Sequence, residues 1–258
     1  MINELQLELS IKCNSKCVMC PRDSVKRNTK GGFMDTELAK KIIDDAYEAG
    51  ARMIKPQWFG ESMLHPNYIE ILQYAKDKGY RIVIFTNGSL LNREMREALI
   101  DIGVDKTFVS IDTCNKNEYE KIRVGLDFDI VLKNVKNFYK HKKPEMKLLI
   151  SAVELGKNNT VGINYAFSGI SDDITVNNTV EYNKISKEKK KKVICKHNVR
   201  SRLVVAFDGK CYLCCHDWLG EYYIGDYKMQ TIKEIWDSNL RKDKLDNLKS
   251  LNICQFCQ

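Results

Sequence analysis

The sequence contains no hydrophobic run long enough to cross a bilayer, so it predicts no membrane-spanning segment. It also lacks an apolar signal segment, because the chain opens with the polar stretch Met-Ile-Asn-Glu. We therefore expect a cytoplasmic protein, in a reducing compartment where clustered cysteines bind metal or take part in catalysis rather than pair as disulfides. No RNA-binding signature is present and the net charge of +8 is moderate, so we expect no nucleic-acid partner and no membrane partner.

Cysteine is abundant, with ten in 258 residues. Three lie between residues 13 and 20, six lie after residue 194, and Cys114 stands alone. Such clustering in a cytoplasmic chain indicates two metal sites. The chain is long enough to bury a substantial core in one or two domains.

The first cysteine cluster is a CxxxCxxC triplet formed by Cys13, Cys17 and Cys20. It follows an alternating apolar run from Leu5 to Ile11, which predicts a β-strand. Soft thiolates suit iron–sulfur clusters, and three of them can hold three irons of a cubane while the fourth iron stays open to a small molecule. Zinc is the alternative, but zinc sites usually take four ligands from paired CxxC knuckles, and this loop contains no histidine.

Strands and helices alternate through the first 180 residues. The apolar periodicity predicts helices over 36–49, 67–78, 92–102 and, with a break near Gly125, 117–140. It predicts strands over 53–59, 81–86, 106–111, 147–153 and 174–177. This order favours a parallel α/β sheet, and about six repeats are too few for a full eight-stranded barrel of about 250 residues. We expect a partial (β/α)6 TIM-type barrel with its chemistry at the C-terminal strand ends.

The chain changes character after residue 183. Residues 184–194 are rich in lysine and predict a solvated linker, with a basic patch for a phosphorylated or nucleotide-linked substrate as the alternative. Beyond it we expect a hairpin over 202–214 that turns at Asp208-Gly209, a helix over 231–241 and a final CxxC. The sequence thus divides into a barrel over 1–183, the linker, and a small α+β domain over 195–258.

Together these features resemble the radical S-adenosylmethionine (SAM) enzymes, and the C-terminal part resembles their SPASM/twitch auxiliary-cluster subgroup. The resemblance implies a [4Fe–4S] cluster on Cys13, Cys17 and Cys20 with SAM on its open iron. It further implies a second, auxiliary [4Fe–4S] cluster whose ligands are Cys195, Cys214, Cys254 and Cys257. Cys211 and Cys215 compete with Cys214, because a regular strand cannot direct all three side chains toward one cluster. A four-cysteine zinc site remains the alternative for this tail.

The resemblance also implies SAM contacts at several strand ends. Gly60, Glu61 and Ser62 resemble the family's Gly-Gly-Glu motif, in which the acid receives the SAM amino group, although Phe59 replaces the first glycine. Thr86 and Asn87 resemble the family's Thr-Asn-Gly. By the same resemblance Ser110 and Asp112 lie near the SAM ribose and carboxylate, Arg123 binds the carboxylate, and Met19 packs near the adenine. The structural alternatives are a surface acid at Glu61, an ordinary turn after Thr86, a solvated helix arginine at Arg123 and plain packing by Met19.

Three functions are compatible with these expectations. The first, by resemblance to the twitch carbohydrate and aminocyclitol dehydrogenases, is an oxidoreductase that cleaves SAM to a 5′-deoxyadenosyl radical. It would oxidise an alcohol of a small polar substrate to a ketone, with the auxiliary cluster as electron acceptor and a flavodoxin- or ferredoxin-type donor. The second is a peptide- or protein-modifying maturase, although only 12 residues precede Cys13 and we expect no leader-binding domain. The third is a non-catalytic metal-binding protein.

Overall fold

The computed structural model describes residues 1–24, 32–155, 161–178, 198–251 and 254. They fall into two compact units. Unit 1 comprises Met1–Lys12, Pro21–Tyr80 and Val180–Gln258, and unit 2 comprises Cys13–Cys20 and Arg81–Thr179. The predicted linker over 184–194 lies outside the described residues, so the domain boundaries stay predictions.

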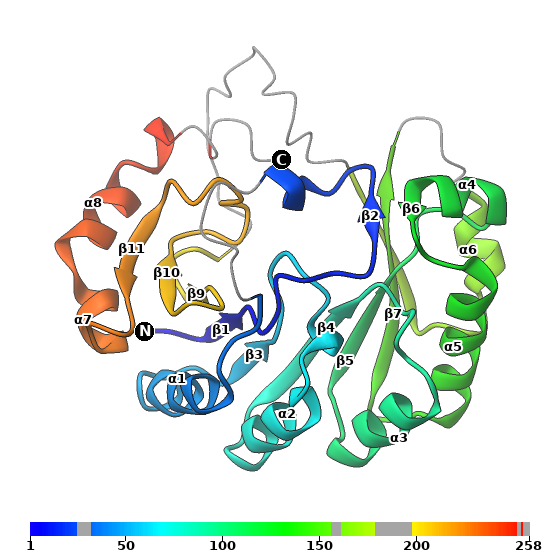
Figure 1. Ribbon diagram of the computed structural model, residues 1–258, viewed down its shortest axis with the longest axis horizontal. Helices are drawn as coiled ribbons and strands as arrows, with labels where there is room; N and C mark the ends of the chain where they lie inside the picture. The colour runs from blue at the N-terminus through cyan, green and yellow to red at the C-terminus, as the bar shows by residue number, and fades with distance from the viewer. Residues whose placement is uncertain (25–31, 156–160, 179–197, 252–253, 255–258) are drawn as a thin grey trace. The chain divides into compact units, whose positions relative to one another are not determined.

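Unit 1 contains a five-stranded sheet with strand order β11-β10-β9-β1-β3 (Figure 1). The strands are β1 (Glu4–Leu7), β3 (Met53–Lys55), β9 (Arg202–Val205), β10 (Lys210–Tyr212) and β11 (Tyr223–Asp226). Strands β3, β1 and β9 run parallel to one another, and β9, β10 and β11 form an antiparallel meander. The predicted hairpin that turns at Asp208-Gly209 is therefore confirmed.

Strand β1, which lies between β9 and β3, is buried on both faces. Leu5 and Leu7 are fully buried, as their apolar character predicts, but Glu4 and Gln6 are buried too. Glu4 forms ion pairs with Lys55 and Arg202, and Gln6 donates a hydrogen bond to the carbonyl of Gln57. Burial of this polar face is tolerated because its charges are paired.

The helices of unit 1 are α1 (Thr36–Glu48), α2 (Tyr68–Asp77), α7 (Ile232–Asp237) and α8 (Asn239–Asp246), with 3-10 turns at Pro21–Ser24, Ser62–Leu64 and Leu248–Ser250. The prediction of one helix over 231–241 is wrong. Ser238 is extended and its hydroxyl accepts a hydrogen bond from the amide of Arg241, so it ends α7 and caps α8.

Unit 2 contains a parallel four-stranded sheet with order β4-β5-β7-β8. The strands are β4 (Arg81–Thr86), β5 (Lys106–Ser110), β7 (Lys147–Glu154) and β8 (Asp173–Asn178). The helices are α3 (Arg93–Ile102), α4 (Lys116–Ile122), α5 (Phe128–His141) and α6 (Val161–Phe167), and Figure 1 shows α3 and α5 on the same side of β5 and β7. A second, two-stranded sheet pairs β2 (Lys16–Cys17) with β6 (Arg123–Val124).

Most predicted elements are confirmed within one or two residues, and the parallel strands confirm the α/β fold class. Two differ. The strand expected over 53–59 ends at Lys55, before Pro56, whose ring removes the N–H that a sheet needs. Helix α6 had no strong sequence signal and was not predicted. None of the described helices is long and apolar enough to cross a membrane.

Candidate functional site

The cysteine triplet lies on a loop that is anchored within unit 2. Cys17 pairs with Arg123 in the two-stranded sheet, and the amide of Val18 donates to the carbonyl of Ile122 at 2.9 Å. The amide of Cys20 closes the loop on the carbonyl of Cys17 at 3.0 Å. Cys13 and Cys17 are half-buried and Cys20 is exposed. The loop therefore has a fixed backbone while its thiols stay accessible to an iron–sulfur cluster.

The Thr-Asn-Gly motif is joined to this loop by side-chain amides. Asn87 donates to the side-chain oxygen of Asn14 at 2.9 Å, and Asn14 donates to the hydroxyl of Ser89 at 2.8 Å. Thr86 is buried and its hydroxyl accepts from the amide of Gly88 at 3.1 Å. Gly88 has φ +80°, and a Cβ there would lie 2.7 Å from a methyl of Val109. The Asn-Gly pair is thus a tight turn that brings β4 to the cysteine loop.

Asp112 and Arg123 form a buried, two-point ion pair in unit 2. Nε and Nη2 of Arg123 lie 2.8 and 3.1 Å from the two carboxylate oxygens of Asp112. Nη1 of the same guanidinium lies 3.8 Å from Sγ of Cys17. Burial alone would lower the pKa of Arg123, but Asp112 and Cys17 raise it, and the net pKa lies above the ordinary value. Arg123 is therefore not the solvated helix arginine of the structural alternative.

The Gly60-Glu61-Ser62 segment lies in unit 1, against the backbone that leads into the cysteine triplet. The amide of Glu61 donates to the carbonyl of Lys12 at 2.8 Å. Glu61 is only 3% exposed, and its carboxylate accepts from the amide of Met63 at 3.4 Å. The surface-acid alternative is thus wrong, and a buried carboxylate is present where an ammonium group could bind. Ser62 is buried and its hydroxyl donates to the carbonyl of Pro56, so it stabilises the same loop.

Two other predicted SAM contacts have partly exposed side chains. Met19 is half-buried in the cysteine loop, and Ser110 is half-buried at the C-terminal end of β5. Both positions leave side-chain surface free for a ligand. Their roles toward SAM stay predictions.

The auxiliary-cluster candidates lie in unit 1. Cys214 and Cys254 are both buried and interact electrostatically, so the structure brings these two predicted ligands together. Cys195 and Cys257 lie outside the described residues. Cys211 is fully buried and its thiol donates to the carbonyl of Gly209, while burial raises its pKa. Burial and a raised pKa are common to both thiols, so it is the interaction with Cys254 that favours Cys214 over Cys211 as a ligand.

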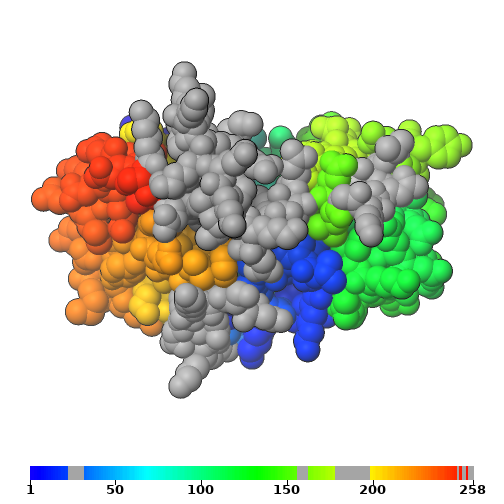
Figure 2. Space-filling view, turned by 90° about the horizontal axis from the view of Figure 1, so that it is seen from above, coloured from blue at the N-terminus to red at the C-terminus, as the bar shows by residue number. Residues whose placement is uncertain are grey.

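Cys215 contacts Arg202 and Trp58. Sγ of Cys215 lies 2.9 Å from Nη1 of Arg202, and its carbonyl accepts from the indole of Trp58 at 2.6 Å. A hydrogen bond from the Cys214 thiol lowers the pKa of Cys215, and His216 and Arg202 lower it further. The strand-parity argument does not apply here, because β10 ends at Tyr212 before either cysteine. In Figure 2 the chain beyond these cysteines, in orange and red, lies on the face that is seen.

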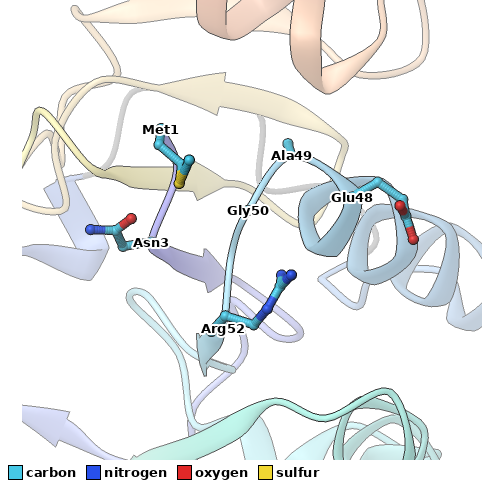
Figure 3. Close-up of a pocket in the computed structure, with 6 residues that line it drawn as sticks. All are labelled: Met1, Asn3, Glu48, Ala49, Gly50 and Arg52. Atoms are coloured by element: carbon cyan, nitrogen blue, oxygen red, sulfur yellow. The ribbon is translucent and has the colours of Figure 1, made fainter.

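A separate cavity of about 590 Å³ lies in unit 1. Figure 3 shows its lining at the end of α1, in the turn to β3 and before β1, namely Met1, Asn3, Glu48, Ala49, Gly50 and Arg52. Arg52 donates to the carbonyls of Tyr47 and Ala51, so its donors already serve the backbone. The cavity lies at the N-terminal ends of β1 and β3, whereas Glu61 follows the C-terminal end of β3. We therefore do not assign it to catalysis.

Sequence reasoning missed four residues that the structure places at these sites. Asn14 and Ser15 are inside the CxxxC spacing, Tyr119 is a buried helix residue, and Arg202 begins β9. Sγ of Cys17 lies 3.0 Å from the hydroxyl of Ser15. A polar pair between two metal-binding cysteines was the available signal for Asn14 and Ser15. Nothing in the local pattern distinguished Tyr119 or Arg202.

The residues present fit an iron–sulfur cluster. The donors are soft thiols, and a guanidinium and a hydroxyl surround one of them, as expected where a cluster's negative charge is stabilised. Within the described ranges, no three cysteine, histidine or acidic side chains are arranged to hold a single metal ion. In a cubane, by contrast, each cysteine binds its own iron.

Two family models match the chain. The model of the Radical SAM superfamily matches residues 7–159, and the model of the SPASM iron-sulfur cluster-binding domain matches residues 195–258. Among curated proteins, a probable GTP 3′,8-cyclase of Methanococcus maripaludis is 31% identical over 134 residues. That match spans 52% of this chain and 44% of the relative, so the chain covers less than half of that relative's length.

Solved structures share the fold. BtrN in complex with AdoMet and 2-DOIA has a TM-score of 0.68 at 17% identity, and 99% of this chain and 92% of that chain are covered. Streptococcus suis SuiB bound to the precursor peptide SuiA has a TM-score of 0.76 at 14% identity, with 100% and 71% covered. The Radical SAM domain implies a [4Fe–4S] cluster and SAM, and the SPASM domain implies auxiliary iron–sulfur clusters. The chain belongs to the radical SAM superfamily and carries a C-terminal SPASM domain.

Proposed function

We propose that this radical SAM enzyme is an oxidoreductase that converts an alcohol of a small polar substrate, such as a sugar or an aminocyclitol, to a ketone. When bound, the reduced cluster and SAM would supply a 5′-deoxyadenosyl radical that abstracts a hydrogen atom from the alcohol carbon, and the auxiliary cluster would accept the second electron as the hydroxyl proton is lost to water. A flavodoxin- or ferredoxin-type protein provides the reducing electron. Residues 1–183 form the catalytic part, 184–194 the linker and 195–258 the auxiliary domain.

The residues have the following proposed roles. Cys13, Cys17 and Cys20 bind the first cluster, and Cys195, Cys214, Cys254 and Cys257 bind the second. The buried carboxylate of Glu61 receives the SAM amino group, on a loop that Gly60 and Ser62 hold. Thr86 and Asn87 position the cysteine loop, and Ser110, Asp112 and Arg123 serve the carboxylate and ribose, with Met19 near the adenine. A charged carboxylate and a guanidinium match the two ends of an amino acid.

The single observation that carries the small-molecule assignment is mutual coverage with BtrN. Nearly all of both chains are covered, 99% and 92%, and that protein is described with AdoMet and 2-DOIA. Against the peptide-bound SuiB, 71% of the other chain is covered. The fold of this chain therefore corresponds to most of a protein that was solved in complex with AdoMet and 2-DOIA.

A contact inside unit 1 supports the role of the auxiliary cluster as electron acceptor. The indole of Trp58 donates to the carbonyl of Cys215 at 2.6 Å. Trp58 is two residues before Gly60, and Cys215 follows the proposed ligand Cys214. A short route of covalent bonds and one hydrogen bond thus joins the SAM-binding loop to the auxiliary site.

The second candidate is a peptide- or protein-modifying enzyme. The specific observation that favours it is the TM-score of 0.76 to peptide-bound SuiB, with all of this chain covered. The two candidates differ in substrate and share the cluster chemistry.

The test begins with anaerobic reconstitution and an iron count. We expect about 8 irons per chain, falling to about 4 in the variant Cys13→Ala/Cys17→Ala/Cys20→Ala, because each cubane holds four irons. Reduced protein is then supplied with SAM and deuterated sugars, aminocyclitols or peptides. Transfer of deuterium from an alcohol carbon into 5′-deoxyadenosine, with formation of a ketone, is the expected result.

The controls test the substrate class and the cluster ligands separately. Deuterium transfer from peptides alone would overturn the assignment as a dehydrogenase and favour the peptide-modifying enzyme. An unchanged iron count in the triple variant would overturn the assignment of the triplet. The triple variant also serves as the background for SAM cleavage without the first cluster.

A further inference from the structure

The surroundings of Cys17 are more polar than a cluster ligand requires. Its sulfur has the hydroxyl of Ser15 at 3.0 Å and Nη1 of Arg123 at 3.8 Å. The Ser15 hydroxyl has a second acceptor, the carbonyl of Val124 at 3.2 Å. A cysteine that binds iron does so as a thiolate, which is the stronger acceptor, so iron binding would draw the Ser15 proton toward the sulfur.

The position of Arg123 is fixed from two directions. Asp112 binds Nε and Nη2 of its guanidinium, which leaves Nη1 on the side of Cys17. Asp112 is itself held by the amide of Val153 in β7 at 2.9 Å. The register between β2 and β6 independently sets Arg123 opposite Cys17. The guanidinium therefore cannot turn away from the sulfur without breaking its buried ion pair with Asp112.

Burial strengthens the electrostatic effect of the Arg123 guanidinium on the sulfur of Cys17. Asp112 is 0% exposed and Arg123 is 8% exposed. Water screens this pair weakly, so although the carboxylate of Asp112 offsets part of the charge, the Nη1 end of the guanidinium acts on Cys17 more strongly than an exposed arginine at the same distance would. A nearby positive charge favours the reduced cluster, which carries one more negative charge.

Tyr119 provides an independent observation. Its ring is fully buried, and its hydroxyl has no hydrogen-bond partner within the part of the chain that the structure describes. That hydroxyl interacts electrostatically with Arg123, Cys17 and Asp112. An orphaned buried hydroxyl is costly, and a cluster bound at Cys17 would bring in further sulfur atoms that could serve as the missing acceptor.

We propose that Arg123, oriented by Asp112, is a positioning residue that keeps a permanent positive charge at the sulfur of Cys17 and raises the reduction potential of the SAM-binding cluster, with Ser15 and Tyr119 as additional donors. The inference rests on the proposed assignment of Cys17 as a cluster ligand. It does not depend on the substrate. The remaining N–H groups of Arg123 stay available for the SAM carboxylate, so this role adds to the expected one.

The test is a redox titration of the reconstituted holoenzyme, followed by EPR. The SAM-binding cluster is identified as the signal that changes when SAM is added. At the midpoint potential of the wild type, Arg123→Gln is expected to lower the reduced-to-oxidised ratio of this signal about tenfold, which corresponds to about 59 mV for one electron. Arg123→Lys keeps the charge without the two-point geometry and is expected to lower the ratio less. An unchanged ratio in an iron-replete Arg123→Gln protein overturns the proposal.

Two milder variants keep the test decisive if Arg123→Gln does not fold. Tyr119→Phe removes a hydroxyl that has no partner among the described residues, and Ser15→Ala removes one hydroxyl from the loop, so both should fold. Each is expected to lower the reduced-to-oxidised ratio, and an unchanged ratio in both overturns the proposal. Arg93→Gln is the charge-matched control, because the side chain of Arg93 is 81% exposed, and its ratio should equal that of the wild type.

The outcome is separable from the proposed function. If Cys17→Ala retains the SAM-responsive signal and all its iron, the ligand assignment fails. If Cys17→Ala loses the signal while the ratio is unchanged in the Arg123, Ser15 and Tyr119 variants, only this inference fails.

Discussion

A Cβ atom on Gly60 would lie 2.0 Å from the carbonyl oxygen of Ser10 and 2.7 Å from that of Lys12. Both obstacles are backbone atoms, so no side-chain rotation can relieve the overlap. The glycine therefore permits the loop that carries Glu61 to lie against the residue before Cys13.

We predict that Gly60→Ala displaces this loop. The expected cost is about 1–3 kcal/mol in the free energy of unfolding, together with weaker SAM binding. Gly103→Ala is the matched control, because Gly103 has φ +71° but nothing within 4 Å of an added Cβ. The control should lose about 1 kcal/mol of stability through backbone strain and keep its SAM affinity. Equal SAM affinity in both variants, measured by calorimetry, would contradict the prediction.

Glu61→Gln isolates the negative charge of the loop proposed to bind SAM. The amide oxygen of glutamine can still accept from the amide of Met63, so the fold should persist. Loss of the carboxylate should weaken SAM binding at least about tenfold, or about 1.4 kcal/mol, because an ammonium ligand loses its counter-charge. Glu234→Gln, at an exposed capping position of α7, is the control and should bind SAM normally. Unchanged affinity in Glu61→Gln would remove Glu61 from the site.

The Asp112–Arg123 pair should be strongly coupled. Asp112→Asn leaves a buried guanidinium without its counter-charge, and we expect a loss of about 3–5 kcal/mol in anaerobic urea unfolding. The double variant Asp112→Asn/Arg123→Gln should lose less than the sum of the single variants. The exposed pair Arg93–Glu97 gives the comparison and should contribute less than about 1 kcal/mol. Additive losses in the buried pair would show that the two side chains act separately.

The auxiliary ligands can be distinguished by single substitutions. Cys214→Ala should remove about 4 irons from the reconstituted protein, because one lost thiolate opens the cluster. Cys211→Ala should keep the wild-type iron content, since the Cys211 thiol is buried and donates to the carbonyl of Gly209. Iron loss in Cys211→Ala with full iron in Cys214→Ala would reverse the assignment.

Asp217 gives a pH dependence with a definite sign. Burial raises its pKa from 3.8 to about 6, although the amides of Glu221 and Tyr222 donate to its carboxylate. The folded state therefore holds more protons than the unfolded state between pH 3.8 and about 6, and the contribution of Asp217 to stability falls as pH rises through that window. A pKa that is higher by one in the folded state than in the unfolded state corresponds to about 1.4 kcal/mol.

This effect is read as a difference between two proteins. Asp217→Asn cannot titrate, so the stability of the wild type minus that of Asp217→Asn should decrease as pH rises from about 4 to about 6. Asp243→Asn, at an exposed residue of α8, corrects for general charge effects. A difference that grows with pH would mean that the backbone donors outweigh burial.

Much of the fold was predictable because its signals are local. Strand β4 and helix α3 follow from apolar periodicity and from the Asn92 cap, whose side chain accepts from the amide of Met95. The break between α4 and α5 follows from Gly125, which has φ +93°. Helix α6 and the interruption at Ser238 were missed, because a seven-residue helix whose buried apolar residues, among those that the structure describes, are Ile163 and Phe167, and a mid-helix serine each give a weak local signal.

The sequence by itself determined the cysteine triplet, the order of strands and helices, and the glycine and acid that follow β3, since these depend on spacing and composition. Only the tertiary structure decided that Arg123 pairs with Asp112 beside Cys17, that Cys215 contacts Arg202, and that Glu61 is buried. Each of these depends on contacts between residues far apart in the chain. Local propensity does not encode such contacts, because they arise when parallel strands and a packed core bring distant segments together.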